Sequence, residues 1–206
     1  IVIVPFGKSI EVGMIIEINV SKQNYNIKKV HKILDSICLN KETIDFIHWI
    51  SNYTLAPIGS VLKLFVINHK IVQHILPPRT KKRIISNAVD LNIEQRTAKK
   101  NILSYFKNSS KPVVLEGVTG SGKTEVYFDL IEKMLKEKRQ LLIMIPEISL
   151  TPQLEKRFFD RFGIEVDIWH SKISEKKRQE IWHKTYRGDT IIVIGARSSL
   201  FLPFTN

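Results

Sequence analysis

Short apolar runs separated by turn residues fill the first thirty positions of the 206-residue chain. Ile1–Val4 and Met14–Ile18 are such runs, and turn residues stand between them at Pro5–Gly7 and at Gly13. Runs of this length between turn signals are typical of β-strands. The pattern therefore predicts a small β unit of two or three strands over residues 1 to about 30.

A helical period follows over residues 43 to 66. Its apolar face repeats at i, i+3, i+4 and i+7 and consists of Phe46, Trp49, Ile50 and Tyr53. Ala56–Gly59 interrupts the helix, and Val61–Val66 forms a second short element. Aromatic side chains can stack on nucleic-acid bases, but packing in a core is the favoured interpretation of this face.

From Asn92 onward, apolar strands alternate with helices. The expected helices are Glu94–Tyr105, Thr124–Arg139, Thr151 to about Gly163, and a helix capped by Ser174 that runs to Tyr186. The expected strands are Val113–Glu116, Leu141–Ile145, Glu165–Trp169 and Ile191–Ile194. This alternation predicts an α/β fold with a parallel sheet covered by helices, preceded by the small β-rich N-terminal part.

A linker is expected between these two parts, because Pro77-Pro78 is followed by a basic run. We expect an N-terminal domain over residues 1–77, a basic linker over 78–91 and a second domain over 92–206.

One motif fixes the chemistry of the second domain. Gly117–Thr124 matches G-x-x-x-x-G-K-[ST] at every fixed position, between a predicted strand and a predicted helix. In that context backbone amides converge on the phosphates of a nucleotide at the positive end of the helix. Lys123 is expected to meet the β- and γ-phosphates and Thr124 to ligate Mg²⁺. The predicted contacts are Gly117, Val118, Thr119, Gly120, Ser121, Gly122, Lys123 and Thr124, and the domain is predicted to be a P-loop NTPase.

Further polar residues follow the predicted strands. In open α/β sheets ligands bind at the carboxyl ends of the strands. Pro146-Glu147, His170-Ser171 and Gly195–Arg197 fall at those ends, together with the phosphate loop. Gln95 opens a helix upstream of the loop, and its amide can both donate to and accept from an adenine edge.

The charge of the chain indicates a polyanionic partner. Lys and Arg number 32 against 20 Asp and Glu, which gives a net charge of +12. An excess of this size favours binding to polyanions, of which nucleic acid is the commonest. Basic clusters lie at Arg79–Arg83, Lys99-Lys100 and Lys176–Arg178, although any single cluster is more often a solvated face.

Other classes of protein are disfavoured. Cys38 is the only cysteine, which fits a reducing cytoplasm and excludes an internal disulfide. The sequence has no run of about 18 apolar residues that would span a bilayer. The histidines are scattered, so no Cys/His cluster has the spacing of metal ligands.

Several longer strings resemble one known family. They are Gly117–Tyr127, Ile145–Gln153, Trp169–Ser171, Gly195–Phe201, and, in the N-terminal part, Val2–Gly7 and Trp49–Leu62. Together they make the chain similar to the bacterial primosomal replication-restart helicases, the PriA family of superfamily 2. Pro146–Gln153 and Arg197–Phe201 are the specific strings, since many families share the phosphate loop.

The resemblance implies an ATP- and Mg²⁺-dependent DNA helicase with a 3′-end-binding N-terminal domain and a RecA-like first motor domain. It implies that Gln95 reads adenine and that Lys123 and Thr124 serve hydrolysis. The DNA contacts that it implies are Pro146, Glu147, Thr151, Gln153, Arg197 and Ser198. The partners that it implies are forked and single-stranded DNA, other primosome proteins and single-stranded-DNA-binding protein.

Two features depart from the family pattern. Members usually carry a winged-helix module between the two domains, whereas only Pro77–Leu91 intervenes here. The chain also has no Asp-Glu dipeptide, so the acidic motif that completes the Mg²⁺ site is expected past Asn206. We therefore expect an N-terminal fragment of a longer helicase that binds DNA and nucleotide but hardly hydrolyses ATP. The family's zinc-binding cysteines are expected only in the missing C-terminal part. A DNA-tethering module with a vestigial phosphate loop, and an unrelated P-loop enzyme acting on a small molecule, are the alternatives.

Overall fold

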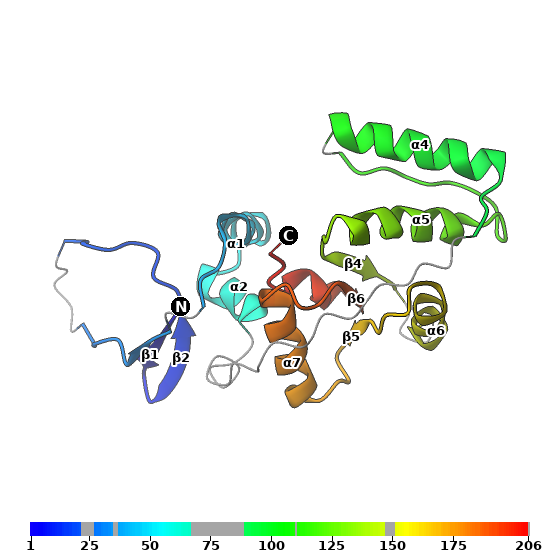
Figure 1. Cartoon of the computed structure of the whole chain (residues 1–206). Helices are drawn as coiled ribbons and strands as arrows, with labels where there is room; N and C mark the ends of the chain where they lie inside the picture. The colour runs from blue at the N-terminus through cyan, green and yellow to red at the C-terminus, as the bar shows by residue number, and fades with distance from the viewer. Residues whose placement is uncertain (22–26, 35–36, 67–88, 110, 147–150, 206) are drawn as a thin grey trace. The chain divides into compact units, whose positions relative to one another are not determined.

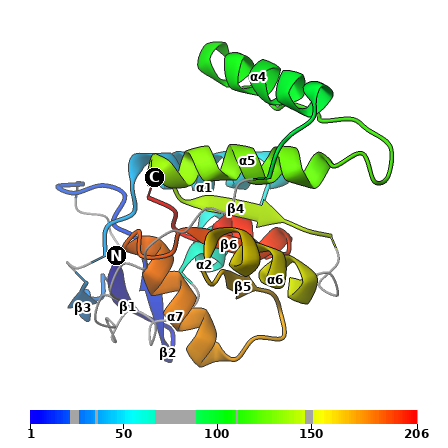
Figure 2. The same ribbon diagram turned by 45° about the vertical axis from the view of Figure 1, so that its right-hand side comes forward.

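The computed structural model describes residues 1–21, 27–34, 37–66, 89–109, 111–146 and 151–205 (Figures 1 and 2). The chain divides into two compact units. The first unit comprises Ile1–Arg79, Trp169–Asp189 and Ser198–Thr205, and the second comprises Thr80–Ile168 and Thr190–Arg197. The predicted linker lies mostly outside the described residues, so the predicted domain boundaries stay a prediction.

The first unit begins with a three-stranded antiparallel sheet. β1 (Val2–Phe6), β2 (Ser9–Gly13) and β3 (Lys32–Ile33) lie in the order β2-β1-β3. Gly7 makes the tight turn between β1 and β2 with a φ of +60°, and Val2 pairs with Gly13. The predicted β unit is confirmed, but the strand expected over Met14–Ile18 was wrong. That segment has no ladder partner among the described residues, and its isoleucines lie largely in solvent.

Two helices follow, as the period predicted. α1 (Lys41–Thr54) starts at Asn40, whose side chain accepts a hydrogen bond from the Thr43 amide at 2.9 Å. It ends at Leu55, which adopts a φ of +56°. α2 (Ile58–Phe65) begins directly after Pro57, where a fixed φ suits the first turn of a helix.

The structure corrects the interpretation of the aromatic face of α1. Ile50 is buried as expected, but Trp49 is 57% exposed and Tyr53 is 75% exposed. The core side of the helix is formed instead by Ile47 and Ile50. Packing in a core therefore does not explain why aromatic side chains occupy positions 49 and 53.

Two segments from late in the chain complete the first unit. α7 (Glu175–Tyr186) buries Trp182 completely, and the Trp182 indole N–H donates to the Phe65 carbonyl at 2.7 Å. The Tyr186 hydroxyl accepts from the Cys38 amide at 2.9 Å. In the 3₁₀ turn η2 (Arg197–Phe201), the Phe201 ring meets the Phe65 ring edge-on with centroids 5.3 Å apart. Phe65 thus lies between α7 and η2.

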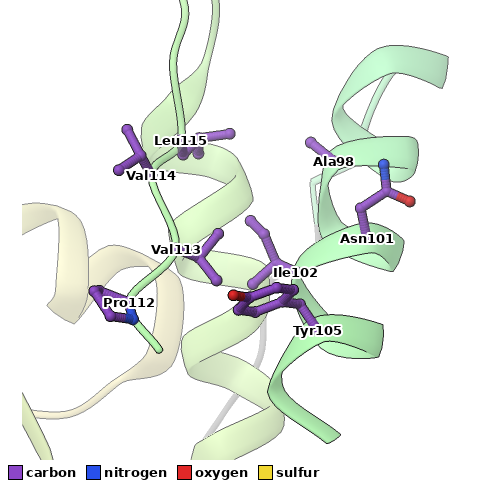
Figure 3. A pocket seen from close by; sticks show the side chains of 8 residues that line it. All are labelled: Ala98, Asn101, Ile102, Tyr105, Pro112, Val113, Val114 and Leu115. Atoms are coloured by element: carbon purple, nitrogen blue, oxygen red, sulfur yellow. The ribbon is translucent and has the colours of Figure 1, made fainter. Parts of the chain in front are cut away.

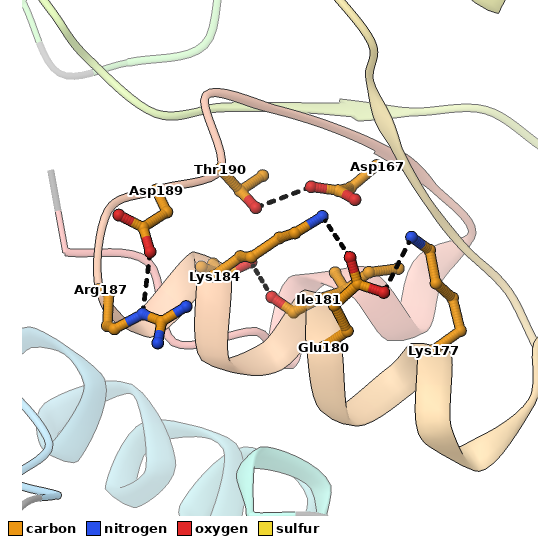
Figure 4. Close-up of polar contacts among 9 residues, drawn as sticks. Asp167, Lys177, Glu180, Ile181, Lys184, Arg187, Asp189 and Thr190 are labelled. Atoms are coloured by element: carbon orange, nitrogen blue, oxygen red, sulfur yellow. Dashed lines mark hydrogen bonds and ion pairs between the residues drawn. The ribbon is translucent and has the colours of Figure 1, made fainter. Parts of the chain in front are cut away.

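Charged side chains line α7 (Figure 4). Glu180 accepts from Lys184 at 2.8 Å and from Lys177 at 3.2 Å. Hydrogen bonds from Lys184, followed by those from Lys177, lower the pKa of Glu180, although burial opposes the shift. These ion pairs follow the i,i+4 and i,i+3 spacing of one helix.

The second unit is an α/β layer. β4 (Leu141–Met144), β6 (Ile192–Gly195) and β5 (Asp167–Trp169) lie in the order β4-β6-β5, and β4 runs parallel to β6. The helices are α4 (Ile93–Asn108), α5 (Lys123–Lys136) and α6 (Thr151–Phe162). The main core cluster consists of Phe128, Leu135, Phe158, Phe162, Ile164, Ile192 and Ile194. The predicted α/β fold with a parallel sheet is confirmed.

The strand predicted over Val113–Glu116 was wrong. The segment before the phosphate loop pairs with no described strand, and Val114 is 88% exposed. Residues Pro112–Leu115 instead run beside α4, where they line a hollow of about 430 Å³ with Ile102 and Tyr105 (Figure 3). A single extended segment has no ladder of its own, because strand hydrogen bonds need a neighbour.

Across the part of the chain that the structure describes, no helix has both the length and the apolar character needed to cross a membrane.

Candidate functional site

The phosphate loop is a glycine-dependent turn between an extended segment and α5. Gly120 has a φ of +81° and Gly122 a φ of +79°. Both values lie in the left-handed region, which glycine adopts without steric cost. The Ser121 amide donates to the Val118 carbonyl at 3.2 Å, which closes the turn. The two inner glycines of the motif are therefore required by the backbone itself.

α5 starts directly at Lys123, with Gly122 as its N-cap and no side chain capping it. The first amides of a helix have no acceptor in the preceding turn and lie at the positive end of the helix dipole. Thr124 is the second residue of this helix and is half-buried. The motif therefore presents open donors where an anion binds most readily.

The Lys123 side chain lies over the loop. Its ammonium group donates to the Val118 carbonyl at 2.9 Å and also to the Gly117 carbonyl. These carbonyls belong to the first two residues of the loop, so the ammonium group lies at the loop whose amides are expected to bind phosphate oxygens.

Gln95 joins the start of α4 to the loop. Its amide nitrogen donates to the Ser121 carbonyl at 3.1 Å, and its amide oxygen accepts from the Asn92 amide at 3.0 Å. The second bond belongs to a capping box, in which Asn92 in turn accepts from the Gln95 amide. A carboxamide has two donor hydrogens and two acceptor lone pairs, so one of each stays free for a base edge. The predicted adenine reader therefore touches the phosphate loop.

Ion pairs fix the helices around the loop. Glu125, in the first turn of α5, accepts from Arg157 of α6 at 2.6 Å, and the Arg157 guanidinium lies 5.1 Å from the centre of the Phe128 ring. Lys99 of α4 forms an ion pair with Asp129 of α5. No sequence pattern predicted these positioning residues. The sequence shows that these residues carry opposite charges. It does not show which charged residues on separate helices form ion pairs.

The other predicted site residues lie past the strand ends. Met144 pairs with Gly195 in the register of β4 and β6, so Pro146 and Arg197 each follow by two residues on adjacent parallel strands. Both are exposed, as are Ser198, at the start of η2, and Gln153, in the first turn of α6. Thr151 is the first residue of α6, and Glu147 lies outside the described residues.

The donors of the loop fit a nucleoside triphosphate. Backbone amides and one ammonium group suit phosphate oxygens, and a threonine hydroxyl is an oxygen ligand of the kind that Mg²⁺ accepts. In the described ranges no three His, Cys, Asp or Glu side chains gather to hold a metal ion.

Two family models match the chain. The 3'DNA-binding domain (3'BD) of PriA matches residues 1–66, and the model described as type III restriction enzyme, res subunit, matches residues 88–204. The "Replication restart protein PriA" of Rickettsia felis is 37% identical over 210 residues, which cover 100% of this chain and 31% of that protein. The proteins of the same name from Haemophilus influenzae and Bacillus subtilis are 43% identical over 120 residues and 44% identical over 117 residues. These alignments cover 58% and 56% of this chain, and 16% and 14% of those proteins.

The chain thus combines a 3′ DNA-binding domain with a helicase-type α/β domain. Helicase-type domains use nucleotide and Mg²⁺ in general. The chain belongs to the PriA replication-restart family. It spans about a third of the length of the Rickettsia relatives that it matches.

Proposed function

We propose that this chain supplies the DNA-binding and nucleotide-binding parts of an ATP-dependent DNA helicase that restarts replication. The whole protein would bind stalled or abandoned forks and unwind DNA so that the replicative helicase can be reloaded. The observation that carries the proposal is the phosphate loop at the start of α5, in a chain aligned over its full length with a PriA relative.

The nucleotide-binding residues have distinct tasks in this proposal. The loop amides and the Lys123 ammonium hold the triphosphate tail, the Thr124 hydroxyl ligates Mg²⁺, and Gln95 uses its free hydrogen and lone pair on adenine. ATP supplies the free energy of γ-phosphate hydrolysis when it is bound. Arg157 positions the first turn of α5 through Glu125, so that Lys123 and Thr124 keep their geometry.

The DNA contacts of the second unit are proposed along the carboxyl edge of the sheet. Arg197 and Ser198 follow β6, whereas Pro146 and Glu147 follow β4 and precede Thr151 and Gln153. A guanidinium group, hydroxyls and helix-start amides are good donors to a phosphodiester backbone and need not read its sequence. These residues would grip a strand of any sequence, as a translocating motor requires.

Hydrolysis is proposed to need more than these residues. The chain has no Asp-Glu dipeptide, and a Walker-type acidic residue holds Mg²⁺ and the attacking water in related ATPases. The 206-residue chain is therefore expected to bind ATP and DNA with negligible turnover. By family resemblance, the partners of the whole protein are other primosome proteins and single-stranded-DNA-binding protein, and its place of action is the bacterial cytoplasm.

Binding of a fluorescent ATP analogue with Mg²⁺ tests the loop. Lys123→Ala should abolish binding, whereas Lys107→Ala, an exposed lysine on α4, should leave it unchanged. Fork DNA is then titrated with and without Mg-ATP. A motor changes its DNA affinity with nucleotide. Unchanged DNA affinity, together with no analogue binding by the unaltered protein, would favour a tethering module with a vestigial loop.

A further inference from the structure

Three aromatic side chains form a stacked row along one face of α1. The Phe46 and Trp49 ring centroids are 6.0 Å apart with planes 18° apart, and the Trp49 and Tyr53 centroids are 5.1 Å apart with planes 11° apart. We call Phe46, Trp49 and Tyr53 the aromatic row. Trp49 has a ring on both faces, so the open face at the end of the row belongs to Tyr53.

The aromatic row rests on the core of the first unit. Phe46 meets the Phe65 ring edge-on, with centroids 5.8 Å apart, and Phe65 is 1% exposed. The buried side chains Ile47 and Ile50 lie on the adjacent face of α1 and anchor the helix in the core. The inner end of the row is therefore fixed, although Trp49 and Tyr53 lie largely in solvent.

The geometry of the row selects a flat aromatic ligand. Near-parallel rings present a π-face that a further planar ring extends, and every nucleobase has such a face. Bases inside a duplex are stacked on both sides, whereas an unpaired base offers a free face. Asp45, four residues before Trp49, is the nearest acidic residue on this side of α1 and lies 8 residues before Tyr53, about 12 Å away along the helix. Its charge therefore stays away from the phosphate beside a base on Tyr53.

We propose that the open face of Tyr53 stacks on an unpaired base of single-stranded DNA, with Trp49 and Phe46 continuing the stack beneath it. The aromatic row lies within residues 1–66, which match the 3'DNA-binding domain, and this match selects DNA over a protein partner. The inference rests on the DNA-binding part of the proposed function and is independent of the phosphate loop.

The test uses the whole 206-residue chain and a fluorescein-labelled single-stranded thymidine oligonucleotide, followed by fluorescence anisotropy. Tyr53→Ala should weaken binding roughly 5- to 150-fold, the range for loss of one base–aromatic stack. Tyr53→Phe keeps the ring and should bind as the unaltered protein does. Leu55→Ala removes a 90%-exposed apolar side chain next to the same helix end and should have no effect.

Two further measurements separate stacking from other causes. Affinity for a closed circular duplex, which has no end base pair, should be equal in Tyr53→Ala and the unaltered protein. Trp49 should respond to single-stranded DNA by fluorescence quenching that Tyr53→Ala reduces. Equal single-strand affinity of Tyr53→Ala and the unaltered protein would overturn the inference and leave the proposed function standing. Failure of the unaltered protein to bind any DNA would overturn both. Dimerisation in sedimentation experiments that Tyr53→Ala abolishes would also overturn the inference, because a second copy would then cover the row.

Discussion

Gly122 should tolerate no side chain, because its backbone angle and its contact with Gln95 both oppose the substitution Gly122→Ala. Its φ of +79° is left-handed, and an L-residue there costs about 1–2 kcal/mol. A methyl group at this position would also lie 2.2 Å from the Gln95 amide nitrogen, so Gln95 must move. Its hydrogen bond to the Ser121 carbonyl is then lost, at about 0.5–1.5 kcal/mol.

The expected loss of unfolding free energy is therefore about 1.5–3.5 kcal/mol. Urea unfolding followed by circular dichroism at 222 nm measures it, because α4 and α5 contribute directly to that signal. Gly59→Ala is the matched control. Gly59 lies inside α2 with no atom within 4 Å of a built methyl group, so alanine should stabilise the protein by about 0.5–1 kcal/mol.

A double-mutant cycle separates the two contributions to the Gly122→Ala cost. In a Gln95→Ala background the contact with the amide is gone, so Gly122→Ala should cost only the backbone part, about 1–2 kcal/mol. Equal stability of Gly122→Ala and the unaltered protein would contradict the backbone cost, and the same cost in both backgrounds would contradict the contribution of Gln95.

Three further predictions concern single side chains. Trp182→Phe removes the indole donor from the buried Phe65 carbonyl and should lower the unfolding free energy by about 1–3 kcal/mol in urea titrations; an unchanged midpoint would contradict the role of that bond. Asn92→Ala breaks the capping box of α4 and should cost about 1 kcal/mol, whereas Asn101→Ala, an exposed residue within the same helix, should cost nothing measurable. Glu180 has a lowered pKa, so its contribution to stability is present above its unfolded pKa and is lost as pH falls through the folded pKa. In Glu180→Gln the melting temperature should accordingly fall less between neutral and acidic pH than in the unaltered protein. An equal fall in both proteins would show that the ion pairs of Glu180 with Lys184 and Lys177 do not stabilise α7.

Local features of the chain were open to prediction from sequence. The helices α1, α5, α6 and α7 follow from side-chain period and end signals, because each helix closes its hydrogen bonds within its own segment. Ser174 was expected to cap α7, and its side chain accepts from the Lys177 amide at 3.3 Å. The phosphate loop is also a local feature, because its glycines, its lysine and the following helix are adjacent in the chain.

Strands were predicted less well, because the hydrogen bonds of a strand come from another segment of the chain. Val113–Glu116 and Met14–Ile18 have strand-like composition, but a strand exists only where a second segment supplies its hydrogen bonds. Composition gives no information on that partner. The same limit applies to the aromatic row, because spacing places Trp49 and Tyr53 on one face without showing whether anything covers it.

Local sequence patterns are sufficient to predict the phosphate loop, the helix positions and the α/β character of the second part, because these depend on neighbours within a few residues. Only the tertiary structure showed that Gln95 bonds to the Ser121 carbonyl, that Arg157 holds Glu125, and that Trp182 donates to a carbonyl 117 residues away. Those contacts join segments far apart in the chain. Their geometry depends on how the whole unit buries its apolar side chains, and no local pattern encodes it.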